Sequence, residues 1–60
     1  MILRITIFGE THETTFDQFV IDNDSAMHRD DMGVIAGLQP GDTYLGGGGA
    51  AVEWSIERCV

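Results

Sequence analysis

The first third of the chain alternates between apolar and polar positions in a way that predicts a β-hairpin. Over residues 2–8, apolar side chains at every second position fall on one face of a strand, with Arg4 and Thr6 on the other. Residues 9–12 (Gly-Glu-Thr-His) predict a turn. Residues 14–21 are rich in β-branched and aromatic side chains and predict the second strand.

The second segment also allows a helix. Phe16, Phe19 and Val20 have the spacing of one helical face, whereas a strand would place apolar side chains on both of its faces. The strand is the preferred interpretation because of the β propensity of the segment, and the short helix is the alternative.

A helix is predicted over residues 25–36. Residues 22–25 (Asp-Asn-Asp-Ser) supply helix-capping side chains, and the acids among them suit the positive end of a helix dipole. Gly37 is a typical residue after a helix, and Pro40 cannot continue one. Gly33 lowers the intrinsic stability of the helix by about 1 kcal/mol relative to alanine. This helix should therefore depend on its packing against the rest of the domain. Its apolar stripe consists of Met27, Val34, Ile35 and Leu38.

Two further strands complete the predicted fold. Residues 42–45 form a short strand, residues 46–49 a flexible glycine connection, and residues 51–60 a clearly alternating last strand. The order β-β-α-β-β predicts one α+β domain over residues 1–60, with one helix on one face of a mostly antiparallel four-stranded sheet. The other face of the sheet should stay open. On it we place Arg4, Thr6, Asp17, Glu53, Ser55, Glu57 and Cys59.

The pattern places two side chains with polar groups, those of Asp31 and Trp54, among apolar residues. Asp31 falls in the apolar sector of the predicted helix, so we expect it at the edge of the core or paired with an arginine such as Arg4. Trp54 alternates with apolar neighbours and is expected to anchor the core, with an exposed recognition residue as the alternative.

The length of the chain limits its stability. A chain of 60 residues buries only about 60% of the surface that its unfolded form exposes. Cys59 is the only cysteine, so no disulfide adds to the core and a reducing, cytoplasmic compartment is expected. The sequence contains no secretory or membrane-spanning pattern. A homodimer would supply further buried surface.

The charge of the chain is its most distinctive feature. Ten acids face three arginines, there is no lysine, and the formal net charge is −7. Such a field repels nucleic acids and anionic membranes and attracts basic protein surfaces. The alternative interpretation is that the excess charge serves solubility alone.

Catalytic and metal-binding patterns are incomplete in this chain. His12 begins a His-Glu-x-x-His pattern, but Phe16 stands where the second histidine would be. The four glycines of residues 46–49 lack the lysine and hydroxyl residue of a phosphate-binding loop. We therefore expect no catalytic residues, no metal and no cofactor. We also expect no pocket of several hundred Å³ in so small a core.

The leading hypothesis is that the protein inhibits a nucleic-acid-binding partner by imitating DNA. Carboxylates spaced like phosphates would occupy a basic groove, driven by the release of counterions. The candidate contact residues are Glu10, Glu13, Asp17, Asp22, Asp24, Asp30, Glu53 and Glu57.

The ten acids, the missing lysine and the compact β-β-α-β-β plan together resemble those of small phage-encoded inhibitors of bacterial defence. Anti-CRISPR proteins and other DNA mimics belong to this class. The resemblance is one of class, so it assigns no role to any single residue. It implies binding to a CRISPR surveillance complex, at the surface that reads protospacer-adjacent DNA, in the cytoplasm of a bacterial host.

An interaction module with an apolar contact is the alternative. Phe8, Phe19 and Ile21 are expected to form an outward patch, and an unprotected sheet edge would pair with another chain or a second copy. Glu53 and Glu57 on the last strand would oppose such edge pairing.

Overall fold

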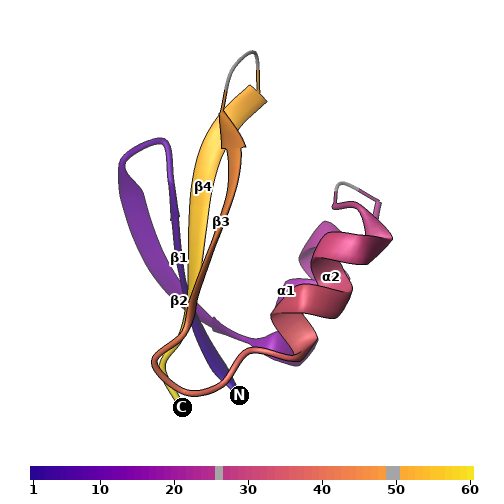
Figure 1. The fold of residues 1–60 in the computed structure, drawn as a ribbon, viewed down its shortest axis with the longest axis vertical. Coiled ribbons are helices and arrows are strands. Elements are labelled where there is room, and N and C mark those ends of the chain that lie inside the picture. Colours follow the sequence, from indigo (N-terminus) through magenta and orange to yellow (C-terminus); the bar gives the residue numbers. More distant parts are fainter. Residues whose placement is uncertain (26, 49–50) are drawn as a thin grey trace.

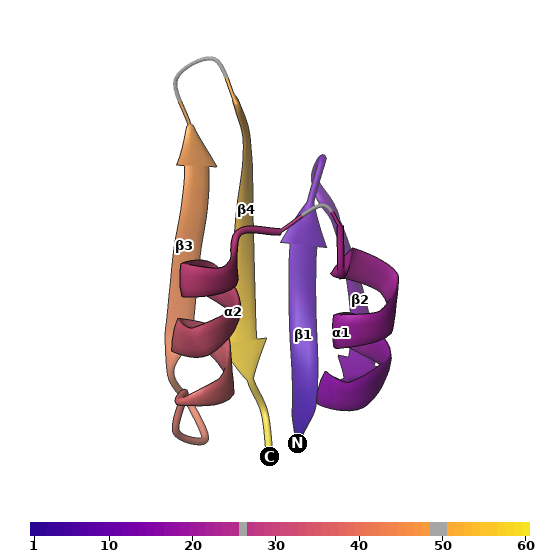
Figure 2. The same cartoon turned by 90° about the vertical axis from the view of Figure 1, so that its right-hand side faces the viewer.

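The protein is an α+β domain in which two helices cover one face of a four-stranded sheet (Figures 1 and 2). The computed structural model describes residues 1–25, 27–48 and 51–60. The elements follow in the order β1 (Ile2–Ile7), β2 (Glu10–Thr15), α1 (Phe16–Asn23), α2 (Arg29–Ala36), β3 (Thr43–Gly48) and β4 (Ala51–Arg58). The sheet order is β2-β1-β4-β3, and all neighbouring strands are antiparallel. The predicted fold class is confirmed, but the predicted β-β-α-β-β order is wrong because there is a second helix.

The first hairpin is tighter than predicted. Ile7 pairs with Glu10, so the loop consists of Phe8 and Gly9 alone, and residues 10–12 belong to β2. Both loop residues have positive φ angles, 53° at Phe8 and 75° at Gly9. This is the pattern of a type I′ turn, whose twist matches that of the flanking strands.

The predicted strand over residues 14–21 is wrong, and the alternative helix is correct. Thr15 ends β2 and caps α1, since its side-chain oxygen accepts a hydrogen bond from the backbone N–H of Gln18 at 3.2 Å. Helix α1 then directs Phe19 into the core, where it is 2% exposed. The cap and this packing outweigh the β propensity of the segment.

Helix α2 begins four residues later than predicted. His28 is its N-cap, and the Nδ1 atom of His28 accepts from the backbone N–H of Asp30 at 3.1 Å. The helix ends at Gly37, as predicted. Residues 22–25 therefore lie at the end of α1 instead of capping the second helix.

The second hairpin also differs from its prediction. Strand β3 continues through Gly46, Gly47 and Gly48, which the sequence had placed in a flexible connection, and Gly49 lies outside the described residues. Strand β4 ends at Arg58. It lies inside the sheet, so the edge strands are β2 and β3, and the expectation that its acids protect an edge is wrong.

The core lies between the sheet and the helices. The rings of Tyr44 and Trp54 pack edge to face, with their centroids 5.5 Å apart. Trp54 is only half-buried, so it packs against the core and is not one of its buried members. Asp31 is partly buried and accepts a hydrogen bond from the hydroxyl of Tyr44 at 2.6 Å, so it lies at the edge of the core, the first of the two expected positions, with a tyrosine and not an arginine as its partner. In the predicted apolar stripe, Val34 is exposed. The buried side chains of the core are Leu3, Ile5, Phe19, Ile35, Leu38 and Ile56.

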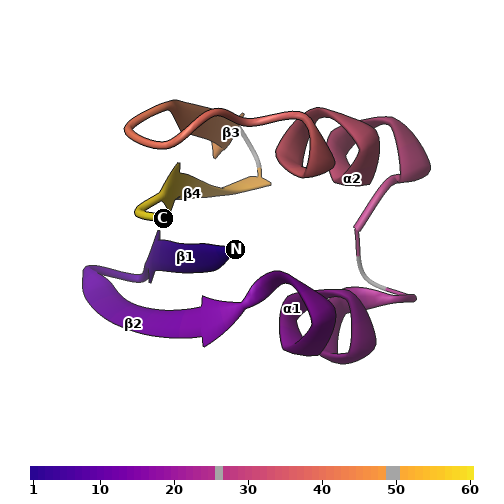
Figure 3. The ribbon, with the colours of Figure 1, turned by 90° about the horizontal axis from the view of Figure 1, so that it is seen from below.

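The two layers separate toward one end of the molecule. In Figure 1 the strands extend above the helices, and Figure 3 shows α1 beside β2 and α2 beside β3. Both helices have eight residues, and among the described segments no helix is long and apolar enough to cross a membrane.

Candidate functional site

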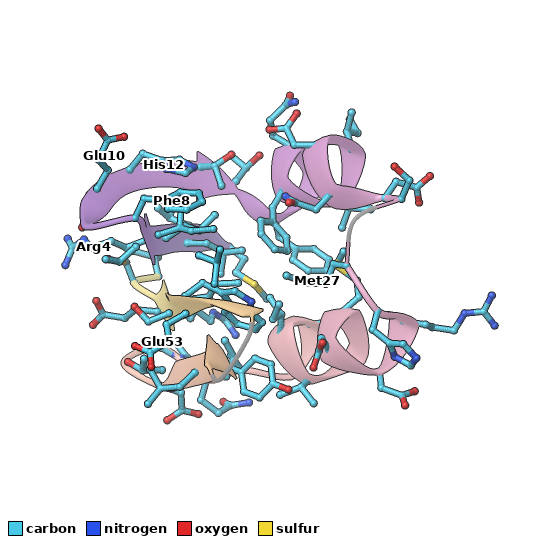
Figure 4. The ribbon with its side chains drawn as sticks, turned by 90° about the horizontal axis from the view of Figure 1, so that it is seen from above. Arg4, Phe8, Glu10, His12, Met27 and Glu53 are labelled. Atoms are coloured by element: carbon cyan, nitrogen blue, oxygen red, sulfur yellow. The ribbon has the colours of Figure 1, made fainter. Side chains whose placement is uncertain are left out.

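Five of the candidate acids lie on or directly after the edge strand β2 and the helix α1, which are on the same side of the molecule (Figures 2 and 3). Their side chains do not share one sheet face, because Glu10 pairs with Ile7 on the face toward the helices and Glu13 pairs with Arg4 on the open face. All five side chains are exposed. Figure 4 shows Glu10 projecting outward from β2. We call this surface the acidic flank; it consists of Glu10, Glu13, Asp17, Asp22 and Asp24.

Two acids of the flank occupy positions that disfavour them. Asp22 lies in the last turn of α1 and Asp24 at its C-cap, where the helix dipole favours cations. The last turn of α1, which the structure describes throughout, carries no basic residue. A carboxylate here opposes the dipole, although Asp22 is partly compensated by a hydrogen bond from the side-chain amide of Gln18, one turn earlier in α1.

Arg4 reduces the charge of the open sheet face. Its guanidinium lies between Glu13 on β2 and Glu57 on β4, at 3.4 and 3.3 Å from their carboxylate oxygens. The electrostatic interaction with Cys59, the hydrogen bond to Glu13 and the carboxylate of Glu57 raise the pKa of Arg4. Glu13 is therefore partly neutralised, and among the described residues Arg4 is the only arginine that pairs with an acid of the flank.

Of the other three candidate acids, Glu57 lies beside Glu13, because Arg4 contacts both, whereas Asp30 and Glu53 lie elsewhere. Asp30 is in the first turn of α2, 3.7 Å from the Nδ1 atom of His28. Glu53 and Glu57 lie on β4, and Figure 4 shows Glu53 and Arg4 projecting from the sheet face that is turned away from the helices. Asp17, which was predicted on that open face, lies on α1 instead.

The predicted apolar patch is wrong in its composition. Phe19 is buried. Phe8 and Ile21 are both exposed, as expected, but Ile21 lies on α1, away from the hairpin loop that carries Phe8. Phe8 is 77% exposed, and Leu45 on β3 is 72% exposed. Both line a shallow hollow of about 280 Å³ on the open face. We call Phe8 and Leu45 the apolar tip; Leu45 has no sequence signal beyond being apolar on a short strand.

The expectation that the core is too small to hold a pocket is also wrong. A cleft of about 400 Å³ opens between the sheet and the helices where the two layers separate. His12 and Asp22 contribute to its lining, although neither was assigned to a pocket from the sequence.

No group of three or more potential metal ligands comes together within residues 1–25, 27–48 and 51–60. Comparison with other proteins adds no assignment, because no protein-family model, curated protein or solved structure matches this chain.

Proposed function

We propose that the acidic flank binds the basic surface of a nucleic-acid-binding protein and thereby competes with nucleic acid for that surface. The observation that carries the proposal is the grouping of exposed carboxylates on β2 and α1, of which Arg4 contacts one. Binding, and not catalysis, is the activity that this surface supports.

The position of the acids on α1 adds to this argument. Asp22 and Asp24 both oppose the helix dipole, and each lowers the stability of the helix by about 0.3–1 kcal/mol. A basic partner would supply the cations that this helix end lacks. Its arginines or lysines would also release the counterions that the flank attracts, so binding should weaken as salt rises.

A narrower form of the proposal concerns the partner. The acidic, lysine-free composition resembles that of phage-encoded inhibitors, and the partner would then be a CRISPR surveillance complex in a bacterial cytoplasm. The contact would lie where that complex reads protospacer-adjacent DNA. This narrower form depends on the resemblance alone.

Two variants of equal net charge test the proposal. Glu10→Lys with Asp24→Lys alters the flank, whereas Asp30→Lys with Glu53→Lys makes the same charge change elsewhere. Each is immobilised and used to capture proteins from a bacterial lysate at low and at high salt. The flank variant should lose partners that the wild type and the control variant retain at low salt. Equal loss in both variants, or capture that resists high salt, would contradict the proposal.

An apolar contact at the apolar tip is the second candidate function. Phe8 has a φ angle of 53° and is nevertheless aromatic and exposed. Asparagine or glycine would fit this turn position with less strain, and strained exposed residues are frequent in binding sites. Phe8→Asn should abolish capture that persists at high salt and should leave capture by the acidic flank unchanged.

A further inference from the structure

The cleft between the layers has an apolar lining and one polar side. Ile7 on β1, Trp54 on β4 and Phe19 on α1 contribute apolar surface. Figure 4 looks into this end of the molecule and shows Met27 between the two helices. The side chains around the cleft therefore come from both layers, and a ligand held there would contact the sheet and the helices together.

The polar side of the cleft is formed where β2 and α1 approach each other. His12 comes from β2 and Asp22 from the last turn of α1. One oxygen of Asp22, Oδ1, accepts a hydrogen bond from the side-chain amide of Gln18 at 2.8 Å. The carboxylate has a second oxygen, which remains able to accept a hydrogen bond from a ligand in the cleft.

We propose that this cleft binds a small molecule that has an apolar body and a cationic amine. The volume of about 400 Å³ lies within the range of ligand sites, which is roughly 300–1,000 Å³. The apolar body would cover Ile7, Phe19 and Met27, with Trp54 adding further apolar surface to the lining. The amine would pair with Asp22.

The charge of the protein selects against other ligands. With a net charge of −7, the field repels carboxylates and phosphates and concentrates cations near the surface. Fatty acids and nucleotides should therefore bind more weakly than cations, although the apolar lining alone would accept a fatty acid. A neutral molecule of the same shape should bind by its apolar body, but more weakly than the amine.

Three probes of similar shape and different charge test this selection. Phenethylamine, 2-phenylethanol and 3-phenylpropionate are titrated into the full chain, and binding is followed by the emission of Trp54, the only tryptophan, and by calorimetry. The amine should bind most tightly, the alcohol more weakly, and the carboxylate weakest of all. Absence of binding by all three, or binding of the carboxylate as tight as that of the amine, would overturn the proposal.

A matched pair of variants locates the amine. Asp22→Asn removes the carboxylate in the cleft, and Asp17→Asn makes the same change on the same helix outside it. Asp22→Asn should weaken the binding of phenethylamine by about two- to fivefold, which is the loss expected for one partly exposed ion pair. The affinity for 2-phenylethanol should stay the same. Equal effects of both variants, or loss of the alcohol as well, would overturn the assignment of Asp22.

A third variant tests the cleft itself. Ile7→Phe enlarges a lining side chain and should reduce the binding of all three probes, while thermal unfolding shows that the chain still folds. Unchanged binding in this folded variant would place the probes elsewhere and overturn the proposal. Asp22 belongs to the acidic flank as well, but the two proposals fail separately, because the variants that test partner capture leave Asp22 in place and the probe titrations need no protein partner.

Discussion

Replacing Gly46 with alanine would place a methyl group where the indole ring of Trp54 lies. Gly46 and Trp54 are cross-strand partners, and a Cβ atom added to Gly46 would overlap the six-membered part of that ring. Trp54 must then move, which also disturbs its edge-to-face contact with Tyr44. The absence of a side chain at Gly46 is thus what allows the tryptophan to cover this part of the sheet.

The expected loss of stability in Gly46→Ala follows from the cost of overpacking a core, which is about 1–3 kcal/mol. A domain of 60 residues has a free energy of unfolding of about 3–9 kcal/mol, so Gly46→Ala should remove a substantial part of it. Each kcal/mol corresponds to about 4–8 °C in the midpoint of thermal unfolding for a domain of this size. The emission of Trp54 should also shift to longer wavelength as the ring becomes more exposed.

Gly33→Ala is the matched control. Gly33 lies inside α2, and an added Cβ atom would have no neighbour within 4 Å, so alanine should stabilise the protein by about 0.5–1 kcal/mol. Thermal unfolding followed by circular dichroism and by Trp54 fluorescence measures both variants. A Gly46→Ala protein as stable as the wild type, with unchanged emission, would refute the packing of Trp54 against Gly46.

Three further predictions concern the turn, the tyrosine and the overall charge. Phe8→Asn should raise the free energy of unfolding by about 1 kcal/mol, because asparagine tolerates positive φ better than phenylalanine; a loss of stability in urea unfolding would contradict this. The hydrogen bond to Asp31, with burial, raises the pKa of Tyr44 above 10.0, so the folded state holds this proton more tightly than the unfolded state. That contribution is complete below about pH 10 and is lost as the pH rises through the folded-state pKa; Tyr44→Phe should therefore show a smaller alkaline loss of stability than the wild type. The midpoint of thermal unfolding should rise with sodium chloride, because salt screens the repulsion among the acids, and a fall would count against clustered carboxylates.

Local patterns predicted part of this fold. The alternation of β1 and β4 identifies both strands, and Gly37 marks the end of α2. The segment after Thr15 was misassigned because its β-branched and aromatic side chains favour a strand locally, whereas the cap at Thr15 and the burial of Phe19 favour a helix. Propensity does not include either tertiary effect.

The remaining errors have the same origin. Gly46 belongs to a strand because a side chain on the neighbouring strand, Trp54, fills its space, and this pairing is remote in sequence. The excess of acids is visible in the composition, but their grouping on β2 and α1 depends on the turn at Phe8 and on the path of α1. The cleft depends on how the two layers separate, which no local pattern encodes.

The most direct test of the acidic flank is to locate where a basic ligand binds. Isotope-labelled protein is titrated with a short oligolysine while the backbone amide signals are followed by nuclear magnetic resonance. The account predicts that the first signals to shift belong to β2 and α1, and that the shifts disappear at high salt. Shifts spread evenly over the chain, or centred on Phe8 and Leu45, would contradict it.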